Sequence, residues 1–198
     1  MDTSNTGSTA HVSTSWTWPN ILTWIRIAAI PLVVVAFYLH SHWADPAAGL
    51  IFAAAGITDS LDGYLARRLG QTSRLGAFLD PVADKLIVAT ALVLLVSRDH
   101  RPVVVLTAAV IIGREIAISA LREWMAEVGQ HRKVAVSLLG KCKTVFQLIG
   151  LALMLYRHSV LAFPTYEVGL ALTVLAAALT LVSMVSYLRA AWPDLKEP

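Results

Sequence analysis

Six long apolar stretches, separated by short polar segments, divide most of the chain. The stretches cover residues 21–39, 47–69, 76–96, 103–125, 139–156 and 165–190. An α-helix of about 20 apolar residues spans a bilayer, and none of the stretches shows the alternating pattern that is typical of a β-strand. The pattern therefore predicts an all-α, polytopic membrane protein with six transmembrane helices.

The two ends of the chain differ from these stretches. Residues 1–15 are rich in Ser, Thr and Asn, which predicts a disordered N-terminal tail. Trp16 and Trp18 follow, and aromatic residues at this place suit an interfacial segment at the level of the lipid headgroups. We expect one six-helix membrane catalytic domain over residues 16–192 and a short C-terminal tail over residues 193–198.

The composition of the chain agrees with a membrane protein. Hydrophobic residues make up 57% of the sequence and charged residues 15%, and the mean hydropathy is +0.65, whereas soluble domains carry about 25% charged residues. The net charge is +3. Because basic residues in a membrane chain reflect its orientation first, we expect no nucleic-acid partner. The single Cys142 excludes an intramolecular disulfide.

Basic residues are distributed unevenly between the two ends of the predicted helices. If both chain termini lie on one side of the membrane, that side carries thirteen of the 16 Lys and Arg residues. Only Arg98, Arg101 and Arg157 then lie on the opposite side. The positive-inside rule makes the first side cytoplasmic.

Four aspartates, Asp59, Asp62, Asp80 and Asp84, interrupt the second and third apolar stretches near the predicted cytoplasmic end. A carboxylate at the centre of a bilayer costs about 2.5–3.5 kcal/mol, so this group needs a compensating partner. At about 100° per residue, Asp59 and Asp62 share one helix face, and Asp80 and Asp84 share another. The connecting turn is short, so we expect the two helices to pack antiparallel with their acidic faces together.

Converging carboxylates form a typical site for one or two Mg²⁺ or Mn²⁺ ions, and such ions bind phosphate-bearing substrates. Gly63, Ala66 and Gly76 lie on the same faces, where they either permit close helix packing or leave room for a flat ligand. Two other roles for the acids are ion pairing with neighbouring Arg and Lys residues and a cation path in a transporter. The position near a membrane edge, without an internal repeat, favours the metal site over a transporter.

The motif as a whole resembles the signature of the CDP-alcohol phosphatidyltransferases. It reads Asp59-x2-Asp62-Gly63-x2-Ala66-Arg67-x8-Gly76-x3-Asp80-x3-Asp84. The resemblance implies the CDP-alcohol phosphotransferase fold, with six transmembrane helices, usually as a homodimer, and a site that faces the cytoplasm. It implies that Asp59, Asp62 and Asp80 bind the metal ions and that Asp84 is a further metal ligand or the general base. The residues implied to bind CDP are Asp62, Gly63, Ala66, Arg67 and Gly76.

The reaction implied by this resemblance transfers a phosphatidyl group from CDP-diacylglycerol to an alcohol and releases CMP. No nucleophilic Ser or Cys is evident, which favours direct attack by the alcohol. Four cations lie at predicted cytoplasmic helix ends, where they suit a phosphate-bearing acceptor: Arg114, Arg122, Lys141 and Lys143. Ordinary positive-inside charge is the alternative explanation for these residues. Further candidates are Asn20, Thr23 and Arg26, and Arg26 is either a ligand contact or a snorkelling side chain.

A wider similarity covers nearly the whole chain between Trp16 and Trp192. The segments that carry it are Pro19–Arg26, Phe78–Lys85, Arg114–Met125 and Gly140–Thr144. They resemble bacterial members of the family that use sn-glycerol 3-phosphate as the acceptor. This resemblance implies a homodimer that is embedded in the lipids of the bacterial inner membrane. A cardiolipin synthase of the same family, with phosphatidylglycerol as acceptor, shares the Asp motif and is the nearest alternative. A membrane prenyltransferase is a more distant one.

Overall fold

A computed structural model describes residues 18–69, 74–127, 138–159 and 163–191 of the protein. Its six α-helices are α1 (Trp18–Tyr38), α2 (Ala44–Leu69), α3 (Arg74–Arg98), α4 (Pro102–Glu127), α5 (Leu138–Tyr156) and α6 (Thr165–Ala191). Each predicted apolar stretch coincides with one helix, so the all-α prediction is confirmed for the described residues. The predicted tails, residues 1–15 and 193–198, lie outside them, as does Trp16.

Within the described residues, two helices are long and apolar enough to cross a membrane, over Pro102–Met125 in α4 and Thr165–Val185 in α6. Only 33% of either apolar window is buried inside the protein, so most of this apolar surface faces outward. Large apolar side chains are also exposed on the other helices, for example Leu32, Leu50 and Val93. Extensive exposed apolar surface is rare on soluble monomers and suits a lipid environment. These features indicate a membrane protein, and the crossing by all six helices stays a prediction.

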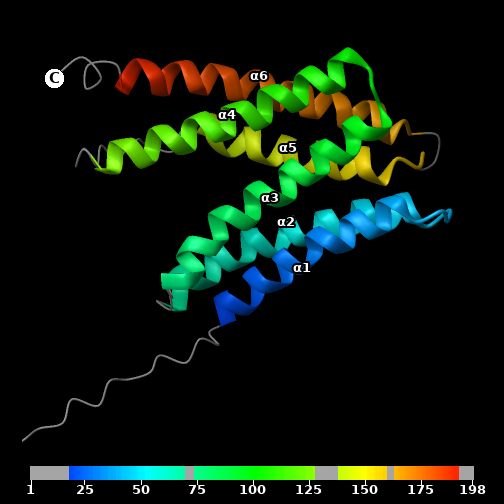
Figure 1. The fold of residues 1–198 in the computed structure, drawn as a ribbon, viewed down its shortest axis with the longest axis horizontal. Helices are drawn as coiled ribbons and strands as arrows, with labels where there is room; N and C mark the ends of the chain where they lie inside the picture. The colour runs from blue at the N-terminus through cyan, green and yellow to red at the C-terminus, as the bar shows by residue number, and fades with distance from the viewer. Residues whose placement is uncertain (1–17, 70–73, 128–137, 160–162, 192–198) are drawn as a thin grey trace, which may run out of the picture.

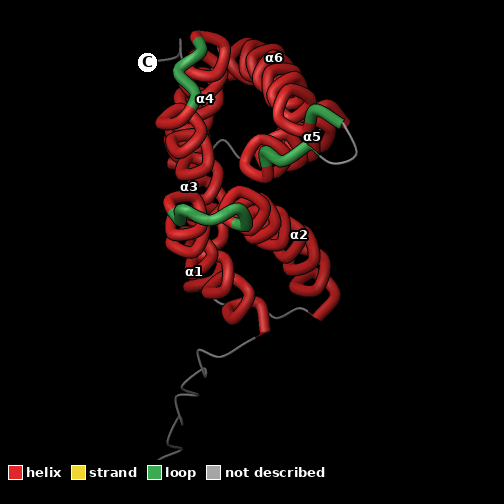
Figure 2. Tube along the Cα trace, turned by 90° about the vertical axis from the view of Figure 1, so that its right-hand side faces the viewer, coloured by secondary structure: helices red, strands yellow, loops and turns green. Residues whose placement is uncertain are grey.

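The helices form two groups with α3 between them. α1 packs against α2 and α5 packs against α6, and α3 runs diagonally from the first pair toward α4 (Figure 1). The view turned by 90° shows the same division (Figure 2). Contacts between α2 and α5 join the two groups directly. This arrangement brings the start of α1, the end of α2 and the start of α3 to one end of the molecule.

Glycines set the distance between closely packed helices. A methyl group added at Gly150 of α5 would lie 2.8 Å from the carbonyl oxygen of Gly169 in α6, and one at Gly169 would lie 2.7 Å from the carbonyl oxygen of Gly150. One at Gly49 of α2 would lie 2.7 Å from backbone atoms of Tyr156 in α5. Small residues permit this close approach, which strengthens van der Waals packing between helices in lipid.

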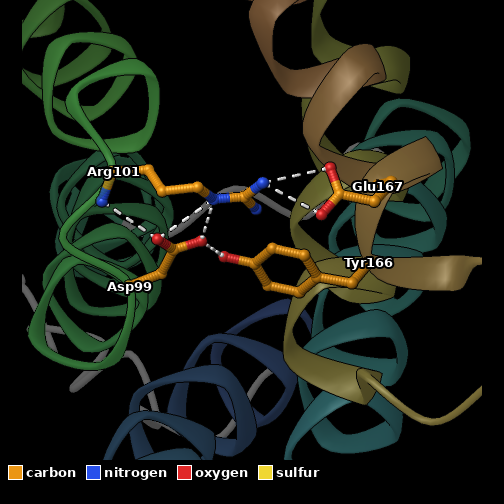
Figure 3. Close-up of polar contacts among 4 residues, drawn as sticks. All are labelled: Asp99, Arg101, Tyr166 and Glu167. Atoms are coloured by element: carbon orange, nitrogen blue, oxygen red, sulfur yellow. Dashed lines mark hydrogen bonds and ion pairs between the residues drawn. The ribbon is translucent and has the colours of Figure 1, made fainter.

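Polar contacts tie the α3–α4 turn to α6 (Figure 3). This turn lies at the end of the molecule opposite the start of α3 (Figure 1). Arg101 lies 2.9 Å from Asp99 and 3.0 Å from Glu167, and the Tyr166 hydroxyl donates a hydrogen bond of 2.6 Å to Asp99. Burial by itself raises the pKa of Asp99, but the hydrogen bonds donated by Tyr166 and Arg101 outweigh it and hold that pKa below its usual value. The ionised form of Asp99 is therefore stabilised in the fold.

A second set of contacts at this end connects α3 to the α1–α2 region. Arg98 pairs with Asp45 in the first turn of α2, and it donates a hydrogen bond of 2.6 Å to the carbonyl oxygen of Phe37. Its guanidinium also lies 3.8 Å from the centre of the Phe37 ring. The three basic residues assigned to the non-cytoplasmic side lie together at this end: Arg98, Arg101 and Arg157.

Candidate active site

Two aspartates of the motif, Asp59 on α2 and Asp84 on α3, contact one guanidinium from α1. The Arg26 nitrogens lie 2.9 Å from Oδ1 of Asp59 and 2.7 Å from Oδ1 of Asp84. Arg26 is only 1% exposed, while the two carboxylate side chains are each 44% exposed. Acids from two helices therefore approach each other at an open surface, with a buried cation behind them.

A third aspartate of the motif is also held from α1. The hydroxyl of Thr23, a residue only 1% exposed, donates a hydrogen bond to Oδ1 of Asp80. Thr23 and Arg26 are three residues apart, so they lie on the same face of the helix. This face of α1 therefore contacts each predicted metal ligand whose side chain is described: Asp59, Asp80 and Asp84.

Several predicted site residues have side chains outside the described part of the structure. The fourth acid, Asp62, is one of them, and so are the predicted CDP-binding residues between and beside the acids. The full set is Asn20, Asp62, Gly63, Ala66, Arg67, Gly76, Arg122 and Lys141. Their roles stay predictions.

The carboxylate chemistry of the acidic site fits a divalent metal ion. Among the side chains described here, no three His, Cys, Asp or Glu residues form a group that could hold a metal. Carboxylate oxygens are the ligands that Mg²⁺ and Mn²⁺ prefer, and Asp59 and Asp84 come within reach of one shared partner. The acids of the motif therefore supply the kind of ligand that these ions bind, and their role as metal ligands stays a prediction.

A polar cavity of about 400 Å³ lies beside Asp84, between α3 and α4. It is lined by Pro81, Asp84, Lys85, Glu115, Ser119 and Glu123. The three α4 residues, Glu115, Ser119 and Glu123, are not among the site residues predicted from the sequence. Their spacing of four residues places them on one helix face, which is the same signal that singled out Asp80 and Asp84, so it could have found them.

An apolar groove of about 430 Å³ adjoins this cavity. The cavity and the groove share four lining residues, Lys85, Glu115, Ser119 and Glu123. The remaining groove residues are aliphatic: Leu86, Val88, Ala89, Ile111, Ile112, Ile116 and Ala120. The polar cavity and the apolar groove therefore lie side by side between α3 and α4.

The predicted acceptor-binding cations are described at two positions. Arg114 is 8% exposed, and it donates a hydrogen bond of 2.6 Å to Glu115. Its Nε atom is buried without a hydrogen-bond partner in the described structure. Lys143 is partly buried. Arg114 is therefore a paired and largely buried cation, and its pairing with Glu115 connects it to a residue of the polar cavity.

Comparison with known proteins gives a consistent match over most of the chain. The family model for CDP-alcohol phosphatidyltransferase matches residues 16–188. Relatives from Shigella flexneri serotype 5b (strain 8401), Salmonella choleraesuis (strain SC-B67) and Escherichia coli (strain K12) are each 52% identical over 177 residues, which is 89% of this chain and 96% of the relative. All three bear the name CDP-diacylglycerol–glycerol-3-phosphate 3-phosphatidyltransferase.

Proposed function

The chain belongs to the CDP-alcohol phosphatidyltransferase family, whose members generally depend on a divalent metal, and we propose that it transfers a phosphatidyl group from CDP-diacylglycerol to sn-glycerol 3-phosphate. The products are phosphatidylglycerophosphate and CMP. The observation that carries this proposal is the 52% identity, over nearly their whole length, to relatives named for that reaction. The complete Asp motif in this chain supports it.

The four aspartates of the motif would hold the metal, as one or two Mg²⁺ or Mn²⁺ ions: Asp59, Asp62, Asp80 and Asp84. When bound, the metal supplies positive charge that neutralises the diphosphate of CDP-diacylglycerol. The CDP group would be surrounded by Arg67 and by three neighbouring small residues, Gly63, Ala66 and Gly76. The convergence of Asp59 and Asp84 on Arg26 supports this assignment, because it brings acids of two helices to one place.

Asp84 is the residue that we assign to proton transfer. It borders the polar cavity, where a hydroxyl group of the acceptor can approach its carboxylate. Asp84 would accept the hydroxyl proton as the acceptor oxygen forms a bond to the phosphatidyl phosphorus. The bond from that phosphorus to the bridging oxygen breaks, and CMP leaves with its electron pair. The apolar groove beside the cavity matches a substrate that is charged at one end and apolar at the other.

The acceptor's phosphate would bind among Arg114, Arg122, Lys141 and Lys143. The buried Nε of Arg114, which has no hydrogen-bond partner in the described structure, is a donor that an incoming phosphate could use. Arg114→Ala should raise the KM for glycerol 3-phosphate more than it lowers kcat, because the contact holds the substrate before reaction. An unchanged KM would contradict the assignment.

We place the enzyme in the bacterial inner membrane as a homodimer, with its active site toward the cytoplasm. The excess of basic residues at the end that carries the acidic motif supports this orientation. It would give the site access to a water-soluble acceptor and a lipid donor at the same membrane surface.

The deciding experiment measures CMP release by the purified chain in detergent–lipid micelles with CDP-diacylglycerol and Mg²⁺ or Mn²⁺. Glycerol 3-phosphate should support turnover, and phosphatidylglycerol should not. Turnover with phosphatidylglycerol alone would instead identify a cardiolipin synthase. Chelation of the metal should stop the reaction, and activity that persists with chelator would refute the metal role.

Asp80→Asn tests the acidic site within the same assay. The substitution keeps the size of the side chain but removes the charge of a proposed metal ligand, so CMP release should fall to background. Asp45→Asn is the matched control, because Asp45 pairs with Arg98 at the opposite end of the molecule. Similar activities of the two folded variants would count against the metal site.

A further inference from the structure

Arg26 is a buried cation within a membrane helix, and its surroundings exclude a snorkelling role. A snorkelling side chain keeps its charged head in water, whereas Arg26 is 1% exposed. Burial of a guanidinium is costly unless it is paired and hydrogen-bonded. Among the described residues, Asp59 and Asp84 of the site pair with it.

The shape of the guanidinium suits this position. Its planar fork presents separate N–H groups in fixed directions, and one terminal nitrogen contacts Asp59 while the other contacts Asp84. A lysine carries the same charge on one ammonium group without that fork. The contact therefore fixes two carboxylates, from α2 and α3, relative to each other and to α1.

Thr23 makes the corresponding contact with the third acid. Its hydroxyl donates a hydrogen bond to Asp80, which lies one helical turn before Asp84 on α3. In all three cases the contact is made through Oδ1 of the aspartate. α1 therefore contacts carboxylates of both α2 and α3 at this site.

We propose that Thr23 and Arg26 are positioning residues, which orient the carboxylates of Asp59, Asp80 and Asp84 before metal and substrate bind. This inference rests on the proposed metal role of the aspartates. Hydrogen bonds to ligating carboxylates fix their orientation, and loss of such outer partners weakens metal affinity by about 10–100-fold. The α1 contacts are therefore expected to set the metal affinity of the site and not only the stability of the fold.

The test measures Mn²⁺ binding to the full chain in detergent, without substrates, from the electron paramagnetic resonance signal of free Mn²⁺. Thr23→Val removes the hydroxyl and nearly preserves shape, while Thr23→Ser retains the hydroxyl. We expect Thr23→Val to bind Mn²⁺ about 10–100-fold more weakly and Thr23→Ser to bind like the wild type. Arg26→Lys should show a loss similar to that of Thr23→Val, because it keeps the charge and loses the fork.

Arg98→Lys is the control for Arg26→Lys, since it makes the same change in a pair at the opposite end of the molecule. It should leave Mn²⁺ affinity unchanged. Only protein that elutes as a folded species in size-exclusion chromatography is titrated, and thermal unfolding is recorded separately. If Arg26→Lys does not fold, the Thr23→Val and Thr23→Ser pair decides.

The outcomes separate this inference from the proposed function. Mn²⁺ binding by the wild type with equal affinity in folded Thr23→Val and Arg26→Lys would overturn the positioning role and leave the metal site intact. An absence of Mn²⁺ binding in the wild type would overturn both. A lower melting temperature without a change in affinity would show a purely structural contact and would overturn the inference.

Discussion

The tight contact between α5 and α6 predicts that replacing glycine with alanine lowers the free energy of unfolding at Gly169 and raises it at Gly113. A methyl group at Gly169 would lie 2.7 Å from the Gly150 carbonyl oxygen, 2.9 Å from the Cβ of Leu153 and 2.9 Å from the backbone nitrogen of Met154. These are backbone or Cβ atoms, which no side-chain rotation can move away. A methyl group at Gly113 of α4 would meet nothing within 4 Å.

The magnitudes follow from these surroundings. Overpacking of a close contact costs about 1–3 kcal/mol, and rigid backbone neighbours put Gly169→Ala near the upper end. Alanine is favoured over glycine inside a helix by about 0.8–1.0 kcal/mol. We therefore expect Gly169→Ala to lower the free energy of unfolding by about 2 kcal/mol, and Gly113→Ala to raise it by up to about 1 kcal/mol.

The assay is thermal unfolding of both variants in one detergent, followed by the loss of helical circular dichroism. For a chain of this size, about 1 kcal/mol corresponds to roughly 2–4 °C in the melting temperature, so the variants should differ by roughly 6–12 °C. All samples share one heating rate, because unfolding of such proteins is commonly irreversible. Equal melting temperatures, or a more stable Gly169→Ala, would refute the view that backbone contact sets the α5–α6 distance.

Two further predictions concern the contacts around Asp99. Tyr166→Phe removes the hydrogen bond to Asp99 and should lower the free energy of unfolding by about 1.5 kcal/mol. This value is the lower end for a hydrogen bond to a charged group, because Arg101 still pairs with Asp99 in the variant. The control is Tyr38→Phe, at a residue that is 59% exposed, which should have almost no effect on the melting temperature. The pKa of Asp99 is lower in the folded state than its ordinary value of 3.8. The ionised carboxylate therefore adds to the free energy of unfolding at any pH above 3.8. This stabilisation is lost as the pH falls through the lowered pKa. The difference in melting temperature between the wild type and Asp99→Asn should therefore be full at neutral pH and shrink below a pH of about 4; a difference that does not change with pH would contradict this.

Much of the helical architecture could be predicted because each helix carries its own signal. Apolar length and composition identified α4 and α6, and they also identified α2 and α3 although aspartates interrupt them. The spacing of Asp59, Asp80 and Asp84 assigned them to helix faces before any contact was known. These properties depend on residues within one or two turns of a single helix, so the local sequence contains them.

The candidate site was less predictable where it depends on other helices. The alternatives for Arg26, a ligand contact or a snorkelling side chain, could not be separated from α1 alone. Its burial against Asp59 and Asp84 depends on how α1 packs beside α2 and α3. The role of Glu115 and Glu123 in lining a cavity with Asp84 likewise depends on the angle between α3 and α4.

The sequence by itself determined the class of protein, the six helices and the candidate acids of the site, because hydropathy and motif spacing are local properties. Only the tertiary structure decided which partners those acids have. Carboxylates placed close together repel one another and are costly to bury, so their arrangement depends on donors that neighbouring helices bring to them. Among the described residues, α1 supplies such donors in Thr23 and Arg26. These residues lie more than fifty positions away along the chain from Asp80 and Asp84.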